Sequence, residues 1–172
     1  MLHTIPMHLR RMADLLKIAS YTPDEIVRAL EVFSGVLKDR KNFIDGGYGK
    51  TPILALSEAG LKKLSEGLTG DLRPIYNSGV AGMEIPFLTY FVTQFLVSVF
   101  AIRQRLEFYD IEGLDKKFPR IGKLDVREIL DGMKGRGYES AKEFLEGHLD
   151  RYIKLFQNTS KLTDKDLALI KK

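Results

Sequence analysis

An uncharged and largely apolar stretch restricts the possible folds more than any other feature of the sequence. From Ile85 to Ile102 no side chain carries a formal charge, and Arg103 follows. The stretch is at the lower limit of length for a membrane-spanning helix, but Pro86, Gln94 and several hydroxyl side chains interrupt it. We therefore expect a helix over residues 85–109 that is apolar all round because other helices surround it. A membrane span is the alternative, and we expect no membrane partner.

Amphipathic patterns predict several more helices around this stretch. Apolar residues recur at helical spacing over residues 8–19, 22–40, 57–70, 126–134 and 138–157, and in a short tail helix within 158–172. Thr22, Pro23 and Glu25 give the clearest start signal, because they combine an N-cap, a proline at the first helical position and a capping box. No alternation of apolar and polar residues is long enough to build a sheet. The sequence therefore predicts an all-α fold, a single helical bundle of about six to seven helices in one domain over residues 1–172, with its N-terminal helix within residues 1–20.

A glycine-rich segment separates two of these helices. Residues 45–52 contain several glycines and end at Pro52, so we predict a loop there. Gly49-Lys50-Thr51 resembles the end of a phosphate-binding P-loop, but Ile44 occupies the position of that motif's first glycine, which favours a plain turn. The helix after the loop leaves a winged helix as an alternative fold.

Composition narrows the chemistry that the chain can perform. The sequence contains no cysteine, which excludes disulfides, thiolate catalysis and cysteine-ligated metals. A chain without cysteine also suits a reducing compartment, and no apolar block follows the first basic residues, so we expect a cytoplasmic protein. The net charge of +4 and pI of about 9.2 permit a polyanionic partner.

Residues with catalytic or metal-binding chemistry do not form a known constellation. The serines lack the spacing of an activated nucleophile, and most carboxylates are spread along solvent-facing helix surfaces, where they pair with lysines at helical spacing. His148 lies on the inner side of a predicted helix, where a lone histidine is more typical of a core than of a metal site. We therefore expect no catalytic residue, no metal and no cofactor, and a protein that is not an enzyme.

The segment Asp125–Arg151 resembles the last helical hairpin of the FCD domain, the effector-binding domain of many GntR-type transcription regulators. It shows an acidic residue, an arginine, an Ile-Leu pair, a small-residue turn, a helix that contains alanine, and a final His-Leu. Glu25–Arg40 is similar to the first helix of that family, and Tyr76–Leu88 is similar to the stretch before its long central helix. The resemblance implies a helical, ligand-sensing regulatory domain.

The same resemblance implies a degenerate metal site. The family commonly binds a divalent metal through one aspartate and three histidines. His148 matches the last histidine, whereas Val126 stands at the place of the preceding one and cannot ligate. Asn77 lies near the first histidine position, and Asp71 lies near the aspartate with an offset. Because few residues precede the first matching helix, we expect a sensor domain without the family's DNA-binding winged helix.

Three functional hypotheses follow. The first is a non-enzymatic binding module for a small organic acid near His148, Asn77 and Arg73, with Arg73 pairing the ligand's carboxylate. The second is a basic subunit of a nucleoprotein complex, similar to the small helical subunits of CRISPR effector complexes. Its phosphate contacts would lie in the predicted basic loop over residues 111–123, at Lys116, Lys117, Arg120 and Lys123. The third is a structural or oligomerisation protein, and we expect a homo-oligomer or a partner protein.

Overall fold

The apolar stretch forms helix α5 (Leu88–Leu106) in the computed structural model. Phe95 and Leu96 on α5 are at most 1% exposed, and the burial of such side chains drives the other helices to pack around it. Val97 on another side of the helix is 48% exposed. The helix is therefore central but not enclosed, and it is shorter than the predicted range of 85–109.

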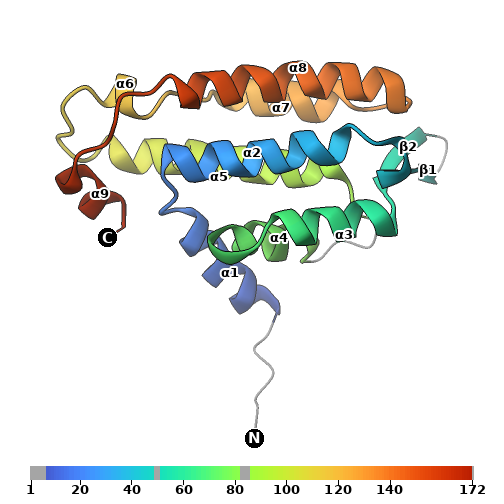
Figure 1. Cartoon of the computed structure of the whole chain (residues 1–172), viewed down its shortest axis with the longest axis horizontal. Helices are drawn as coiled ribbons and strands as arrows, with labels where there is room; N and C mark the ends of the chain where they lie inside the picture. The colour runs from blue at the N-terminus through green and yellow to red at the C-terminus, as the bar shows by residue number, and fades with distance from the viewer. Residues whose placement is uncertain (1–6, 49–50, 82–85, 172) are drawn as a thin grey trace, which may run out of the picture.

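The structure describes residues 7–48, 51–81 and 86–171, and Figure 1 shows their helices stacked in layers. Helix α2 lies beside α5 in the middle layer, α7 and α8 form one outer layer, and α3 and α4 form the other, with α1 beyond them. The bounds are α1 Met7–Ile18, α2 Pro23–Leu37, α3 Glu58–Gly67, α4 Arg73–Val80, α7 Lys123–Gly132 and α8 Tyr138–Gln157. Two short helices, α6 (Leu114–Lys117) and α9 (Asp164–Ile170), lie at the end where α5 finishes. The prediction of an all-α helical bundle is confirmed.

Helix α2 begins where the sequence predicts and connects the layers. The backbone N–H of Thr22 donates to Glu25 Oε1 at 3.3 Å, which satisfies one of the free donors at the helix start. Phe33 packs edge-on against Phe95 of α5, with ring centroids 5.8 Å apart. At the other end, the buried hydroxyl of Tyr138 donates to the carbonyl of Leu37 at 2.9 Å and fixes the start of α8.

The prediction that residues 45–52 form only a loop is wrong. Strands β1 (Phe43–Tyr48) and β2 (Thr51–Leu56) pair antiparallel, and Gly46 and Gly47 face Ile53 and Pro52 across the ladder. Backbone groups make ladder hydrogen bonds whatever the side chain, so glycines can join a strand. Both strands are edges of a two-stranded sheet, where a proline is tolerated. Gly49 and Lys50, which carried the P-loop similarity, lie outside the described residues.

Other local differences from the sequence prediction are smaller. Helix α7 begins at Lys123, three residues before the predicted start at residue 126, and the carboxylate of Asp125 accepts from the backbone N–H of Gly122 at 3.2 Å. The predicted basic loop over 111–123 contains the short helix α6. Two 3₁₀ turns, η1 (Arg40–Asn42) and η2 (Gly70–Leu72), precede β1 and α4.

Substitution by alanine should have opposite effects on the free energy of unfolding at two helical glycines. A Cβ at Gly60 would lie 2.2 Å from the backbone oxygen of Asn42, whereas a Cβ at Gly147 would meet nothing within 4 Å. We expect Gly60→Ala to lower the free energy of unfolding by about 2 kcal/mol or more, because the overpacked atom belongs to the backbone. Gly147→Ala should raise it by about 0.5–1 kcal/mol by reducing the freedom of the unfolded chain. Urea unfolding of both variants measures the difference, and equal effects would contradict this packing at Gly60.

Candidate functional site

His148 lies on α8 with both ring nitrogens close to acceptors of the protein itself. Its Nδ1 is 2.9 Å from the carbonyl oxygen of Phe144, one turn earlier. Its Nε2 is 3.7 Å from a carboxylate oxygen of Glu128 on α7. The side chain is 16% exposed and its ring lies against that of Phe144. These contacts suit a histidine that joins α7 and α8.

Arg73 and Asn77, the two predicted partners of His148, lie on α4. The guanidinium of Arg73 donates to the hydroxyl of Ser65 at 2.8 Å and is stacked over the ring of Tyr76 at 4.4 Å, and Asn77 is exposed. Figure 1 shows α2 and α5 between α4 and α8. The structure therefore does not bring the three predicted ligand-binding residues together.

The four basic residues of the predicted phosphate-binding loop do not form one common surface, because each makes different contacts. Lys117 Nζ lies 2.8 Å from a carboxylate oxygen of Asp166 on α9, and the pair is largely buried. Arg120 forms an ion pair with Asp115 at 3.3 Å. Lys116 and Lys123 form no ion pair with any residue that the structure describes, and Lys123 Nζ is 5.6 Å from the centre of a phenylalanine ring. Half of the predicted positive charge is therefore neutralised within the fold.

The buried pair of Lys117 and Asp166 predicts a stability change in acid. The hydrogen bond from Lys117 lowers the pKa of Asp166 below its ordinary value of 3.8, and the N–H of Thr163 lowers it further. A lowered pKa means that this carboxylate stabilises the fold above pH 3.8, and that the contribution is lost as the pH falls through the folded-state pKa. Asp166→Asn should cost about 1–3 kcal/mol at pH 7. Unfolding measured from pH 7 to pH 2 should show this deficit shrinking below pH 3.8, and a constant deficit would contradict the pairing.

Arg103 is a buried charge near the end of α5. Its side chain is 4% exposed. Val92, Leu96 and Val99, which precede it at spacings of three and four residues, are all 0% exposed. Arg103 therefore continues the buried stripe of the helix. A guanidinium at such a position is costly to desolvate and is stable only with good partners.

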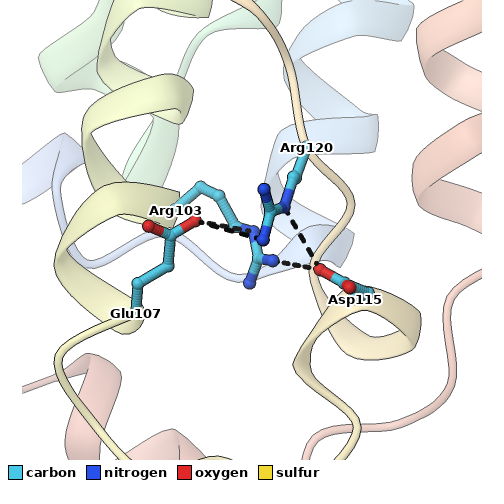
Figure 2. Close-up of polar contacts among 4 residues, drawn as sticks. All are labelled: Arg103, Glu107, Asp115 and Arg120. Atoms are coloured by element: carbon cyan, nitrogen blue, oxygen red, sulfur yellow. Dashed lines mark hydrogen bonds and ion pairs between the residues drawn. The ribbon is translucent and has the colours of Figure 1, made fainter.

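Three charged side chains surround Arg103. Asp115 of α6 accepts a hydrogen bond from Arg103 Nη2 and also lies 3.3 Å from Arg120 Nε. Glu107, the residue that caps the C-terminal end of α5, is 3.9 Å from Arg103 Nε and 3.8 Å from Arg120 Nη2. Figure 2 shows the two guanidinium groups between the two carboxylates. This arrangement of four residues is called the Arg103 cluster below.

The hydrogen-bonding capacity of Arg103 is not fully used. Its Nε and Nη1 are buried, and they have no hydrogen-bond partner among the residues that the structure describes. The 3.9 Å separation from Glu107 is an ion-pair distance and is too long for a hydrogen bond. A buried N–H without a partner costs about 1–3 kcal/mol. The Arg103 cluster therefore retains unfilled donors at its centre.

A pocket of about 680 Å³ lies over the Arg103 cluster. Arg103, Glu107, Asp115 and Arg120 line it together with Lys116, Asp110 and apolar or backbone groups of the chain between α5 and α6. Asp115 and Arg120 are 74% and 68% exposed, so burial does not fix these two side chains as it fixes Arg103. A guanidinium presents parallel donors that match a carboxylate or a phosphate. The charged lining is balanced, with three basic and three acidic side chains, and Asp115 occupies the donor of Arg103 that such a group would use.

Sequence reasoning missed Arg103, although a signal was present. Arg103 occupies a buried position of the helical pattern, at i+4 from Val99, where an apolar residue is expected. A charge that breaks such a pattern marks either an internal ion pair or a binding site. Its partners could not be found in this way, because Asp115 and Arg120 approach it only through the path of the chain after α5.

The described residues form neither a candidate metal site nor a membrane-spanning helix. No group of three or more His, Asp or Glu side chains there could hold a metal ion. None of the helices there combines the length and the apolarity needed to cross a membrane.

The chain has no match among known proteins in three comparisons. No family model matches it, and neither the curated proteins nor the solved structures contain a match. The similarity of Asp125–Arg151 to the FCD domain thus stays a prediction from the sequence.

Proposed function

We propose that this chain is a non-enzymatic, ligand-binding helical module whose ligand presents a carboxylate or phosphate group to Arg103. The observation that carries the proposal is the buried guanidinium with two unpartnered nitrogens beneath a pocket. A purely structural ion pair would gain stability by satisfying those donors or by being replaced with apolar side chains. In a site for an external oxyanion, by contrast, these N–H groups stay unpaired with protein acceptors until the ligand binds. The sequence hypothesis of a small organic acid as ligand is retained, and its site moves from His148, Asn77 and Arg73 to the Arg103 cluster.

The carboxylates already present support this choice of ligand chemistry. Asp115 shares one oxygen between Arg103 and Arg120, which is the role that a ligand carboxylate would take. Because Asp115 is 74% exposed, its release into water costs little. The incoming anion would displace Asp115 from Arg103 Nη2, and a rotation of the guanidinium toward the pocket would let the buried Nε and Nη1 donate to it as well. Binding then replaces the carboxylate of Asp115 by a ligand carboxylate that makes more hydrogen bonds to Arg103.

A thermal-shift titration tests the proposal. Sodium acetate, succinate and phosphate are added to the protein, with sodium chloride at matched ionic strength as the reference. Each anion that binds the folded state raises the Tm in proportion to the logarithm of its concentration above Kd. We expect at least one oxyanion to raise the Tm of the unmodified protein. The same oxyanion should not raise the Tm of Arg103→Met. A Tm that follows ionic strength alone for all three anions would overturn the proposed function.

Removing the internal competitor should strengthen binding. In Asp115→Asn the side chain no longer competes as an anion for Arg103 and Arg120. We expect the affinity for acetate and phosphate to increase about twofold to fivefold, the range of a partly exposed ion pair. Asp110→Asn is the matched control, because Asp110 lines the same pocket and its substitution changes the net charge equally. An equal gain in both variants would mean that only net charge matters, which contradicts a displacement at Arg103.

A further inference from the structure

A second pocket lies next to the Arg103 cluster along α5. It has a volume of about 580 Å³ and is lined by Val97 and Phe100 of α5 and by Val126 and Leu130 of α7, with Lys123, Arg127 and Asp131 around them. Val97 and Leu130 are 48% and 46% exposed. Apolar side chains thus form a groove, open to solvent, between two helices. This groove is called the α5–α7 groove below.

The groove and the Arg103 cluster are adjacent. Phe100 lies three residues before Arg103, about 4.5 Å along the helix axis, and Val97 lies about 4.5 Å further. On the other wall, Lys123 lines the groove and follows Arg120 by three residues. Lys123 Nζ lies 5.6 Å from the centre of the Phe100 ring. The groove therefore ends within about one helical turn of Arg103, although no residue lines both pockets.

The charges along the groove favour an anion at the end near Arg103. Lys123 and Arg127 form no ion pair with the residues that the structure describes. Asp131 is paired with Lys134 at 3.2 Å, which offsets the one negative charge of the lining. The rim is therefore positive next to an apolar floor, a combination that complements a molecule with a negative head and an apolar tail.

We propose that the ligand is an amphiphilic carboxylate, with its head at Arg103 and a single aliphatic chain in the α5–α7 groove. This inference rests on the proposed function, because it takes Arg103 as the site of the head group. Binding of the head group alone would not depend on the aliphatic chain. The inference therefore predicts in addition that affinity grows with the chain length of the carboxylate. Burial of a methylene is favourable by about 0.8 kcal/mol when complete. Each added carbon in a half-open groove should thus raise the affinity about twofold to fourfold, until the chain passes Val97.

Calorimetric titrations with acetate, hexanoate, octanoate and decanoate, all below their micelle concentrations, test the inference. We expect octanoate to bind at least tenfold more tightly than acetate, and octanol, which lacks the charge, to bind more weakly than octanoate. Val97→Gln and Leu130→Gln should remove most of the gain with chain length while acetate still binds. Leu155→Gln is the matched control, because Leu155 is a partly exposed apolar residue on α8, outside the groove, and it should keep the full gain.

The possible failures are distinguishable. Acetate or phosphate binding that depends on Arg103 but shows no gain with chain length would overturn the amphiphile inference and leave the proposed function standing. Octanoate binding that persists in Arg103→Met would also overturn it, because the chain would then adsorb without its head-group site. No binding of any of these anions would reject the proposed function together with the inference.

Discussion

Replacing Leu96 by alanine should lower the free energy of unfolding by about 2–5 kcal/mol. Leu96 is 0% exposed and lies in the middle of α5, so its truncation removes buried apolar contacts and leaves a cavity. A loss of this size is a large part of the total stability of a domain. Urea unfolding followed by circular dichroism measures it directly.

The next residue of the same helix is a matched control. Val97 is 48% exposed, so Val97→Ala should change the free energy of unfolding by only about 0.5 kcal/mol. Both substitutions leave a good helix former in α5, so their difference reports on burial rather than on helix propensity. Similar losses in the two variants would contradict the orientation of α5 described above.

Arg103→Met should leave the free energy of unfolding unchanged or raise it by about 1–2 kcal/mol in the absence of ligand. Methionine fills a similar volume without unpartnered nitrogens. Asp115 and Glu107, which lose a partner, are 74% and 45% exposed and can be hydrated. The same variant should lose oxyanion binding by tenfold or more, because the buried donor is gone. A substitution that preserves the fold and abolishes binding identifies Arg103 as a binding residue.

Arg105, two residues later, supplies the contrasting case, although its Nε is also buried without a partner among the described residues. Its Nη2 donates to the backbone carbonyl groups of Ala19 and Ile170, so it joins the ends of α5, α1 and α9. Arg105→Met should therefore destabilise the protein by about 1–3 kcal/mol. If Arg103→Met were as destabilising as Arg105→Met, Arg103 would be a structural residue and the binding proposal would lose its basis.

Local signals in the sequence were sufficient to predict most of the helices. The start of α2 at Thr22 and Pro23 and the course of α8 both depend on residues within a few positions of one another, and the predictions there are confirmed. The hairpin was missed because glycines and Pro52 obscure the alternation on which strand prediction depends. Backbone pairing between Phe43 and Leu56 is a contact that no single segment reveals.

The candidate site was harder to predict than the fold. The resemblance directed attention to His148, whose ring nitrogens lie near groups of α7 and α8. Arg103 was visible as a charge in a buried stripe, but its significance depends on Asp115 and Arg120, which reach it through tertiary structure. Unpartnered nitrogens are likewise a property of three-dimensional packing, which helical periodicity does not encode.

An NMR titration that follows the Nε–Hε resonances of the arginine side chains tests directly whether Arg103 binds an oxyanion. Sodium acetate is added at constant ionic strength, with Arg103→Met used to assign the Arg103 signal and Arg73→Met to assign that of Arg73. We expect a saturable shift of the Arg103 resonance, enhanced in Asp115→Asn, and no saturable shift at Arg73. A saturable response at Arg73 or at the His148 ring, with Arg103 unmoved, would contradict oxyanion binding at Arg103.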